Sequence, residues 1–257
     1  MIITLLTDFG QSSYYVAAMK GVILSICPDA KIVDITHNIS PQDIDEAAFV
    51  LNQTYSLFPA GTIHTIVVDP GVGTERKPII VKTNDYYFVA PDNGVLSYIF
   101  QNSEGAEVYE ADNKNFFRKE ISSTFHGRDI FAPVAAGLSL DISLYEFGGK
   151  INSLHVLPIP KPSLDSEGNL VGKVLHIDRF GNLITNIRSG DLPGKDVMIE
   201  AAGHCIQGIS SYYAQNKGVM AIVGSTGYLE ISLRNGSACD LLGMVVGDEI
   251  RVISVTE

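Results

Sequence analysis

Three side chains that could position and activate a water molecule lie at turns in the first half of this sequence. Asp69 and Arg76 enclose a glycine-rich turn directly after an apolar run, and His126 precedes a predicted helix, with Gly127 beside it. An aspartate paired with an arginine could position a water molecule and shift its acidity, and histidine exchanges a proton near neutral pH. The structural alternatives, an ion pair in a turn and an ordinary surface or core histidine, stay open from these stretches alone.

Asp8 occupies a second position suited to ligand binding, in Thr7-Asp8-Phe9-Gly10 between a predicted strand and a predicted helix. Open α/β sheets bind ligands beyond the carboxyl ends of their strands. A carboxylate there could accept hydrogen bonds from both hydroxyls of a ribose, or hold a cation, whereas the structural alternative is a helix N-cap. Protein kinases share the Asp-Phe-Gly triplet, but their glycine loop and His-Arg-Asp loop are missing from this sequence, which excludes a kinase.

Polar loops with aromatic or glycine residues separate the predicted strands of the last third. One loop contains Asp178, Phe180 and Asn182, and two similar loops lie at 224–228 and 234–237. An aromatic ring can stack on a purine, and an amide can hydrogen-bond to its edge. Each loop alone is more typical of a β-turn, so these residues are candidates for base recognition and no more.

Alternating strands and helices must position the candidate residues of the first half. Apolar periodicity and turn residues predict strands at 2–6, 32–35, 62–68, 79–82 and 86–89, and helices at 15–27, 40–57, 95–100 and 129–138. We expect Ser40 as the N-cap of the second helix with Pro41 at its first position, Asp129 as the cap of the last helix, and Asn84-Asp85 as a hairpin turn. The alternation predicts an α/β domain with a central, mostly parallel sheet.

The second part of the chain has short, turn-bounded strand patterns and no long helical one. The predicted strands are 172–177, 183–187, 197–201, 219–223, 228–233 and 249–255. A run dense in proline, Leu157 to Ser163, marks the domain boundary. The sequence therefore predicts an N-terminal α/β domain at 1–156, a proline-rich linker at 157–169 and a small all-β, barrel-like domain at 170–257.

Composition limits the classes of protein that this chain can be. It has 257 residues, of which 46% are hydrophobic and 18% charged, which is typical of a globular protein. The net charge of −11 argues against nucleic-acid binding, because phosphate groups would be repelled. The three cysteines form no C-x-x-C pair, the N-terminus has no basic leader, and no apolar run reaches about 18 residues. We expect a soluble, cytoplasmic protein without membrane contact.

Taken in chain order, the motifs resemble those of the S-adenosylmethionine (SAM) hydrolase family, also called SAM hydroxide adenosyltransferases and related to the fluorinases and chlorinases. Any one motif is weak, but together they cover essentially the whole chain in family-like order. The motifs are Thr7-Asp8-Phe9-Gly10, Ile26-Cys27-Pro28-Asp29, Val68-Asp69-Pro70-Gly71-Val72-Gly73-Thr74, Phe125-His126-Gly127-Arg128-Asp129, the loop from Ile177 to Asn182, and Gly224-Ser225-Thr226-Gly227-Tyr228.

The resemblance implies the hydrolysis of SAM to adenosine and L-methionine, with no metal or other cofactor. It also implies a homotrimer that binds SAM at subunit interfaces. By the same resemblance, Asp8 grips the ribose, Asp69, Arg76 and His126 hold the attacking water or hydroxide, and Asp178 contacts the methionine ammonium. The remaining implied substrate contacts are Phe180 and Asn182 for adenine, Ser225 for the methionine carboxylate, and Tyr228, Arg234 and Gly236 in the adjoining loops. The choice between Asp69 and His126 as the base stays open.

Departures from the family pattern refine this expectation. Fluorinase-like members carry an aromatic residue in place of Asp69 and a serine in place of Gly127, so halide use is not expected here. Ser13 replaces a common aspartate, and Thr226 replaces the arginine found in fluorinase, so contacts to the amino-acid end of SAM differ.

Two other functions remain as alternatives. The first is a metal-dependent phosphoester hydrolase, with Asp8, Asp69, His126 and Asp129 as ligands of a hard metal ion. The second is a SAM or adenosine sensor that binds its ligand without turnover. Such a sensor would need the ribose and adenine contacts but would have no use for Asp69, Arg76 and His126 as a group.

Overall fold

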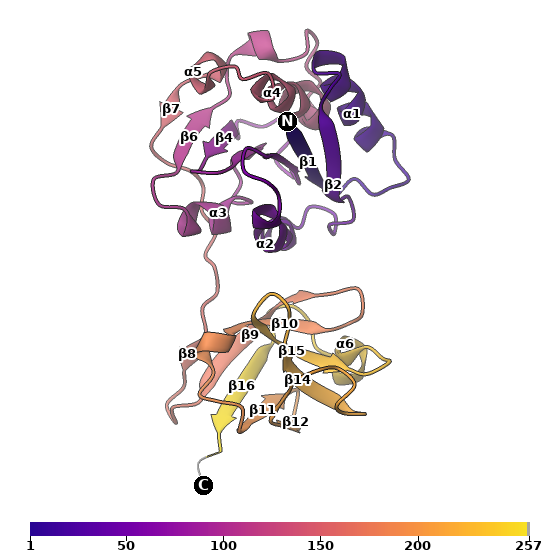
Figure 1. Cartoon of the computed structure of the whole chain (residues 1–257), viewed down its shortest axis with the longest axis vertical. Coiled ribbons are helices and arrows are strands. Elements are labelled where there is room, and N and C mark those ends of the chain that lie inside the picture. The colour runs from indigo at the N-terminus through magenta and orange to yellow at the C-terminus, as the bar shows by residue number, and fades with distance from the viewer. Residues whose placement is uncertain (256–257) are drawn as a thin grey trace. The chain divides into compact units, whose positions relative to one another are not determined.

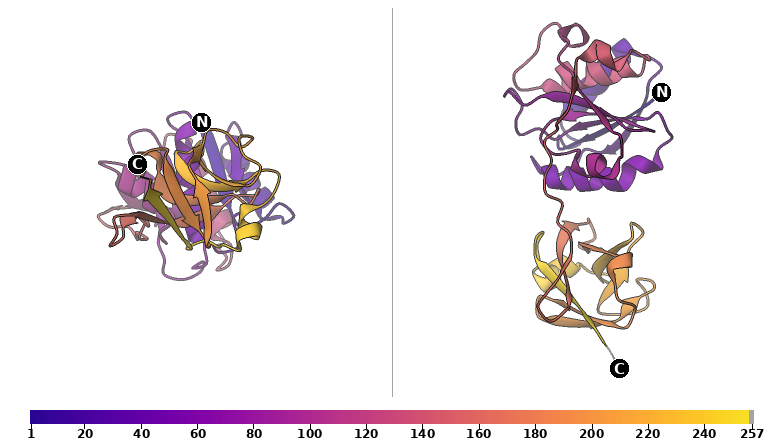
Figure 2. Two further views of the ribbon diagram at one scale, coloured as in Figure 1. Left: turned by 90° about the horizontal axis from the view of Figure 1, so that it is seen from below. Right: turned by 90° about the vertical axis from the view of Figure 1, so that its left-hand side faces the viewer.

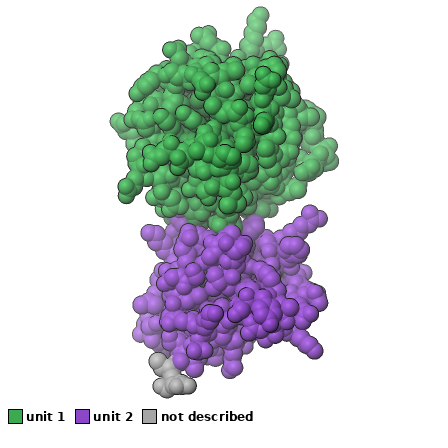
Figure 3. Space-filling view, in the orientation of Figure 1, with its two compact units in different colours: residues 1–158 green, residues 159–257 purple. Residues whose placement is uncertain are grey.

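The computed structural model describes residues 1–255 of the chain, which divides into two compact units, 1–158 and 159–257 (Figures 1 and 3). The division falls within the proline-rich segment, between Pro158 and Ile159. On the first unit's side of that division, Leu157 donates its backbone N–H to Ser97 Oγ at 2.8 Å. On the other side, Ser163–Leu164 forms strand β8, which pairs with β9 of the second unit.

The first unit alternates strands and helices up to β3, as the apolar periodicity predicts. Its strands are β1 (Ile2–Thr7), β2 (Lys31–Thr36), β3 (Ile63–Val67), β4 (Pro78–Lys82), β5 (Tyr87–Pro91), β6 (Glu107–Glu110) and β7 (Lys150–Ile151). Its helices are α1 (Tyr15–Ile26), α2 (Ile44–Thr54), α3 (Ser97–Asn102), α4 (Ala132–Leu138) and α5 (Leu144–Phe147).

The sheet of this unit is mixed, so the expectation of a mostly parallel sheet is wrong for part of it. The strand order is β2-β1-β3-β5-β4-β6-β7. The pairs β1–β2, β1–β3 and β3–β5 are parallel, whereas β4–β5, β4–β6 and β6–β7 are antiparallel. The tight turn between β4 and β5 accounts for the reversed direction of β4, because a hairpin joins only antiparallel neighbours.

Helices cover both faces of this sheet (Figures 1 and 2). Side chains of β1 alternate between the faces: Ile3 and Leu5 pack with Met19 of α1 and with α4, whereas Leu6 packs with Leu51 of α2. This period-two alternation places apolar groups in both cores, as a sheet buried on both sides requires. The carboxyl ends of β1 and β3 are thereby fixed next to each other, with Thr7 in register with Val67.

The start of α2 differs from the prediction. The N-cap is Asp43, whose side chain accepts the N–H of Glu46, and Ser40 and Pro41 lie outside the helix. The backbone N–H of Asp43 donates to Ser40 O, and Gln42 has φ +67°. With proline at the second position and a left-handed residue at the third, residues 40–43 form a type II turn. Proline suits that turn as well as the first position of a helix, which explains the error.

The second unit is built from antiparallel pairs, apart from a short parallel pairing of β13 with β14. Its strands are β8, β9 (Leu170–Ile177), β10 (Leu183–Arg188), β11 (Val197–Ala201), β12 (His204–Gln207), β13 (Ile209–Ser210), β14 (Val219–Val223), β15 (Tyr228–Leu233) and β16 (Glu249–Ser254), with the short helix α6 (Ala238–Leu242). The order β12-β11-β16-β9-β10-β15-β14-β13 curls around an apolar interior into a nearly barrel-shaped sheet (Figure 2).

Sequence patterns missed the shortest elements of both units. The strands β6, β7, β8, β12 and β13 and the helices α5 and α6 are absent from the predicted elements. All of them have only two to five residues, which is too short for a period of 2 or 3.6 to stand out from turns. The C-terminal strand was predicted to reach residue 255 and ends at Ser254.

Candidate active site

Asp69 and Arg76 lie in the turn that follows β3 and form a close ion pair. Arg76 Nε donates to Asp69 Oδ1 at 2.9 Å and to Oδ2 at 3.1 Å, and its Nη2 also donates to Oδ2. The two side chains are only 9% and 5% exposed. Gly73 shapes the turn with φ +80°, and a Cβ there would strike the carbonyl oxygen of Ser123. Glycine is therefore required where this turn presses against the segment that leads to His126.

His126 completes a chain of contacts with this pair. Arg76 Nη2 lies 2.7 Å from His126 Nδ1. A guanidinium has only donors, so Nδ1 must be the acceptor and the proton of the neutral ring must sit on Nε2. The structure therefore brings Asp69, Arg76 and His126 together and leaves His126 with an N–H donor on its other side.

The surroundings of His126 favour this neutral ring. Burial lowers its pKa below the usual 6.5, the positive charge of Arg76 lowers it further, and Asp69 and Asp129 oppose the change. Protonation would also place a second donor on Nδ1, opposite the donor of Arg76. His126 is thus an uncharged hydrogen-bond donor at neutral pH.

Asp129 is not the helix cap that the sequence predicted. It lies inside a π-helical turn, Gly127–Phe131, that leads into α4, and its side chain is 0% exposed. Its carboxylate accepts Arg128 Nε at 2.6 Å, Ser122 N at 2.9 Å and Arg118 Nη1 at 3.3 Å. These donors hold the pKa of Asp129 below its usual value against the effect of burial. Asp129 thus ties the segment before His126 to the turn after it.

Asp8, Asp69 and His126 line one pocket of about 380 Å³ in the first unit. Its wall also includes Phe9, Tyr15, Gln42, Thr124, Phe125 and Gly127. Asp8 is not the N-cap of α1, which begins after Tyr14, so the structural alternative for Asp8 is wrong. Its Oδ2 instead accepts the backbone N–H of Gln42 at 2.8 Å.

The loop between β9 and β10 in the second unit is organised by Asp178. Its Oδ1 accepts Phe180 N at 2.8 Å and Asn182 N at 2.9 Å, and its Oδ2 accepts Asn182 Nδ2 at 2.8 Å. The turn also needs Gly181, which has φ +79° and meets Ser237 where a Cβ would stand. Local hydrogen bonds of this kind are typical of aspartate in turns, and here they fix the loop that presents Phe180.

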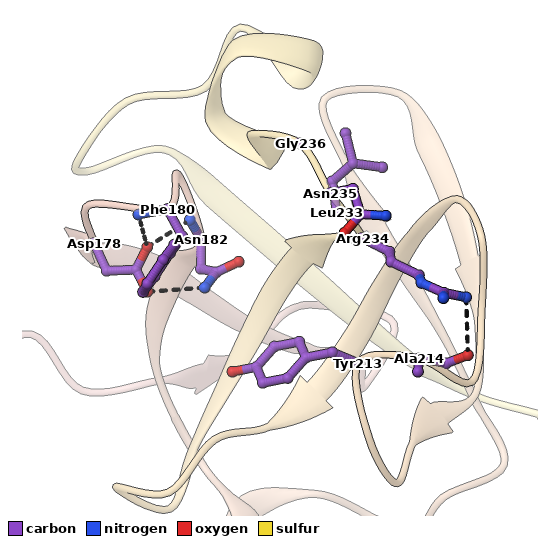
Figure 4. A pocket seen from close by; sticks show the side chains of 9 residues that line it. All are labelled: Asp178, Phe180, Asn182, Tyr213, Ala214, Leu233, Arg234, Asn235 and Gly236. Carbon is purple, nitrogen blue, oxygen red and sulfur yellow. Dashed lines mark hydrogen bonds between the residues drawn. The ribbon is translucent and has the colours of Figure 1, made fainter.

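A second pocket of about 790 Å³ lies against this loop (Figure 4). Asp178, Phe180 and Asn182 face it from one loop, and Tyr213, Ala214, Leu233, Arg234, Asn235 and Gly236 complete its described lining. Phe180 is 78% exposed. Arg234 Nη1 donates to Ala214 O at 3.4 Å, which links two of these segments.

Ser225 and Tyr228 lie elsewhere, outside the described lining of both pockets. Tyr228 is 3% exposed, and its hydroxyl accepts Arg188 Nη2 at 2.7 Å while the guanidinium lies over its ring. Sequence analysis missed Tyr213, whose hydroxyl donates to the buried Glu230 at 3.0 Å. No local pattern marks Tyr213, because its partner lies 17 residues further along the chain.

Family models match both units. The model of the SAM hydroxide adenosyltransferase N-terminal domain matches residues 3–148, and that of the C-terminal domain matches residues 172–251. The chain belongs to the SAM hydroxide adenosyltransferase family. The resemblance drawn from the motifs is thereby confirmed, and the matched ranges include each residue singled out above.

Curated relatives of this family carry two names. An (R)-S-adenosyl-L-methionine hydrolase of Methanocaldococcus jannaschii is 36% identical over 98% of this chain and 95% of its own length. A fluorinase of an Actinoplanes species is 31% identical over 74% of this chain and 73% of its own. Among solved structures, an uncharacterized conserved protein from Thermotoga maritima is 39% identical, with a TM-score of 0.91 over 98% of this chain and 100% of that one.

The described residues show neither a metal-binding cluster nor a membrane-spanning helix. Within residues 1–255, no group of three or more His, Cys, Asp or Glu side chains is placed to hold a metal ion. Each helix in the same range is too short or too polar to span a bilayer. The four ligands considered for a hard metal do not converge, because Asp129 is tied to Arg118 and Arg128 and lies outside the described pocket lining.

Proposed function

We propose that this chain hydrolyses S-adenosyl-L-methionine to adenosine and L-methionine. The observation that carries the proposal is the chain of contacts Asp69–Arg76–His126, in a member of this family. Its two ends, Asp69 and His126, line the same pocket as Asp8. Relatives that span nearly the whole chain at 33–36% identity are named hydrolases, whereas the fluorinase relatives match about three quarters of it.

The reaction needs little catalytic assistance at the sulfur atom of SAM. The sulfonium of SAM departs as a neutral thioether, so no acid is needed for the leaving group. The rate depends on holding a water oxygen in line with the ribose 5′ carbon and the sulfur. Alignment of this kind can contribute about 7–11 kcal/mol to lowering the barrier. The C5′–S bond breaks as the C5′–O bond forms, and the water gives up one proton.

We propose the following roles within the group. His126 Nε2–H donates to the nucleophilic oxygen and orients it, because its Nδ1 is occupied by Arg76. Asp69 lines the pocket, and we assign it as the base that accepts the proton of the water. Arg76 holds both partners in place. Asp8 would accept the hydroxyls of the ribose and so fix the 5′ carbon relative to the water.

The second unit would supply recognition of the rest of the substrate. Phe180 would stack on the adenine, Asn182 and the backbone near Arg234 and Gly236 would meet its edge, and Asp178 would attract the methionine ammonium. Ser225 and Tyr228 complete the set that the family resemblance assigns. We propose a homotrimer in which each SAM molecule is bound by two subunits, acting in the cytoplasm without a metal. The family resemblance supports this assembly.

One experiment tests the proposal against its alternatives. Purified protein is incubated with SAM, with and without EDTA, and the products are separated by chromatography. Equal amounts of adenosine and methionine, unchanged by the chelator, are the expected result. Intact SAM that stays bound would show a sensor, and turnover that EDTA abolishes would show a metal enzyme. Halide added in the same assay should yield no 5′-halogenated adenosine, since Asp69 takes the place of the fluorinase aromatic residue.

A further inference from the structure

One residue in the turn before α2 has a backbone conformation that is unusual for its residue type. In the type II turn Ser40-Pro41-Gln42-Asp43, the third position requires φ > 0 and is normally glycine or asparagine. Gln42 occupies it with φ +67°. A side chain with a Cβ is strained in this region, and such residues gather at sites where the strain serves a function.

The backbone of Gln42 already has a task in the proposed site. Its N–H donates to Asp8 Oδ2 at 2.8 Å, so the left-handed turn fixes the carboxylate that would hold the ribose. Glycine in the same turn would make this hydrogen bond with less strain. The backbone contact alone therefore does not explain a glutamine at this position.

The side chain offers a reason for glutamine at this position. Gln42 lines the same pocket as Asp8, Asp69 and His126, and it is exposed, so its amide is free of the packing that would otherwise select a residue. An amide carries a donor and an acceptor that can meet a sugar hydroxyl or a purine edge. The position thus combines a strained backbone with a polar group at the pocket wall.

We infer that Gln42 is a substrate-contacting residue whose side-chain amide hydrogen-bonds the nucleoside part of the substrate beside Asp8. This inference rests on the proposed function. Gln42 would then have two roles: its main chain orients Asp8, and its side chain binds the nucleoside that Asp8 also contacts. The local strain is retained because glycine would perform only the first task.

The test separates the amide from the backbone with two variants. Gln42→Gly and Gln42→Ala both lack the amide, but only glycine relieves the left-handed strain. Both should raise the KM for SAM by the same factor, about 3- to 10-fold for one hydrogen bond, with kcat little changed. The affinity for adenosine, measured by calorimetry, should fall by the same factor. Gln42→Gly should melt at or above the wild-type temperature, by up to about 3 °C.

A matched control lies in the second unit. Ala202 has φ +48° in the exposed turn between β11 and β12. Ala202→Gly should also melt at or above the wild-type temperature while KM and adenosine affinity stay unchanged. If Gln42→Gly keeps the wild-type KM and adenosine affinity, the glutamine has only a structural role and the inference is wrong. Wild-type protein that leaves SAM intact would instead refute the proposed function, so the two failures are distinguishable.

Discussion

The pockets of the two units are built in opposite ways. In the first unit, charged groups are interlocked and nearly buried: Arg76 and Asp69 are 9% and 5% exposed, and Asp129 is 0% exposed. In the second unit, the wall includes two exposed rings, Phe180 at 78% and Tyr213 at 47%. Polar groups fixed before the substrate arrives stabilise developing charge, whereas exposed rings gain free energy when a ligand covers them.

This difference separates chemistry from recognition. Changes to Asp69, Arg76 or His126 in the first unit should lower kcat, because these groups are proposed to act on the reacting atoms. Changes in the second should raise KM, because they remove surface that binds substrate and transition state alike. The following predictions test the separation, beginning with the largest effect.

Replacing the proposed base should have the largest effect. Asp69→Asn keeps the shape of the side chain but removes the charge that pairs with Arg76, and it cannot accept the proton of the water. We expect kcat to fall by about 10²- to 10⁴-fold with KM for SAM changed little, measured by chromatography of adenosine. Glu110→Gln is the matched control, since Glu110 forms an exposed ion pair with Lys77 in the same unit. Near wild-type turnover of Asp69→Asn would refute its role as base.

Acid should inactivate the same group. Below the lowered pKa of His126, the protonated ring can no longer accept the N–H of Arg76 at Nδ1. The kcat should therefore hold at neutral pH and decline only below the usual histidine range, under about pH 6.5. A decline that begins well above that range would contradict the neutral donor assigned to His126.

How far the sequence predicts this site depends on the distance over which each contact acts. The turn from Asp69 to Arg76 and the loop from Asp178 to Asn182 are held by local hydrogen bonds, and both had been recognised as candidate sites. Asp129 was misassigned because its partners include Arg118, 11 residues away, on a segment without a clear pattern. Tyr213 was missed for the same reason.

The fold shows a similar limit. The positions of β1, β3 and α1 follow from apolar periodicity, and their observed ends differ from the predicted ones by a residue or two. Strand direction does not follow from periodicity, because parallel and antiparallel strands alternate alike. The hairpin turn between β4 and β5 indicates that β4 is antiparallel to β5, whereas the strand–helix alternation indicates only the parallel pairs.

The next effect concerns stability, where one buried group in each unit, His64 and Glu230, should respond to pH in opposite directions. His64 of β3 is 0% exposed among aromatic rings, and burial lowers its pKa to about 4 from 6.5. The unfolded chain therefore binds this proton first as the pH falls. The stabilising effect of neutral His64 on the folded state is therefore complete above pH 6.5. It is lost as the pH falls to 4, which lowers the free energy of unfolding by about 3 kcal/mol. His64→Phe should remove this loss, measured by urea unfolding at several pH values.

Glu230 is the counterpart in the second unit. Burial and the charge of Asp178 raise its pKa above the usual 4.5, against the hydrogen bond from Tyr213. Protonated Glu230 therefore stabilises the folded state below pH 4.5, and this stabilisation is lost as the pH rises through the raised pKa. Glu230→Gln should gain stability relative to wild type at neutral pH and not at pH 4. The same pH response from both variants would contradict the contrast between the units.

Removing an exposed ring from the second pocket should have a smaller effect, confined to KM. Stacking of a base on an aromatic side chain contributes about 1–3 kcal/mol. Phe180→Ala should therefore raise KM for SAM by about 5- to 100-fold and leave kcat at saturation within about twofold. Tyr212→Ala is the control, because Tyr212 is 60% exposed beside Tyr213 but is not part of the described pocket lining. A fall in kcat with unchanged KM would place Phe180 with the reacting groups instead.

The smallest expected effect tests how tightly the first pocket is packed. A Cβ on Gly127 would lie 3.2 Å from Val67 Cγ1 and 3.3 Å from Met19 Sδ, both of which are buried. Gly127→Ala should therefore lower the free energy of unfolding by about 1 kcal/mol. Gly21→Ala in α1 meets nothing within 4 Å and should raise it by a similar amount through helix propensity. Equal stabilisation of both variants would mean that the residues packed behind His126 can move to admit a methyl group. The first pocket would then not be more rigid than the second.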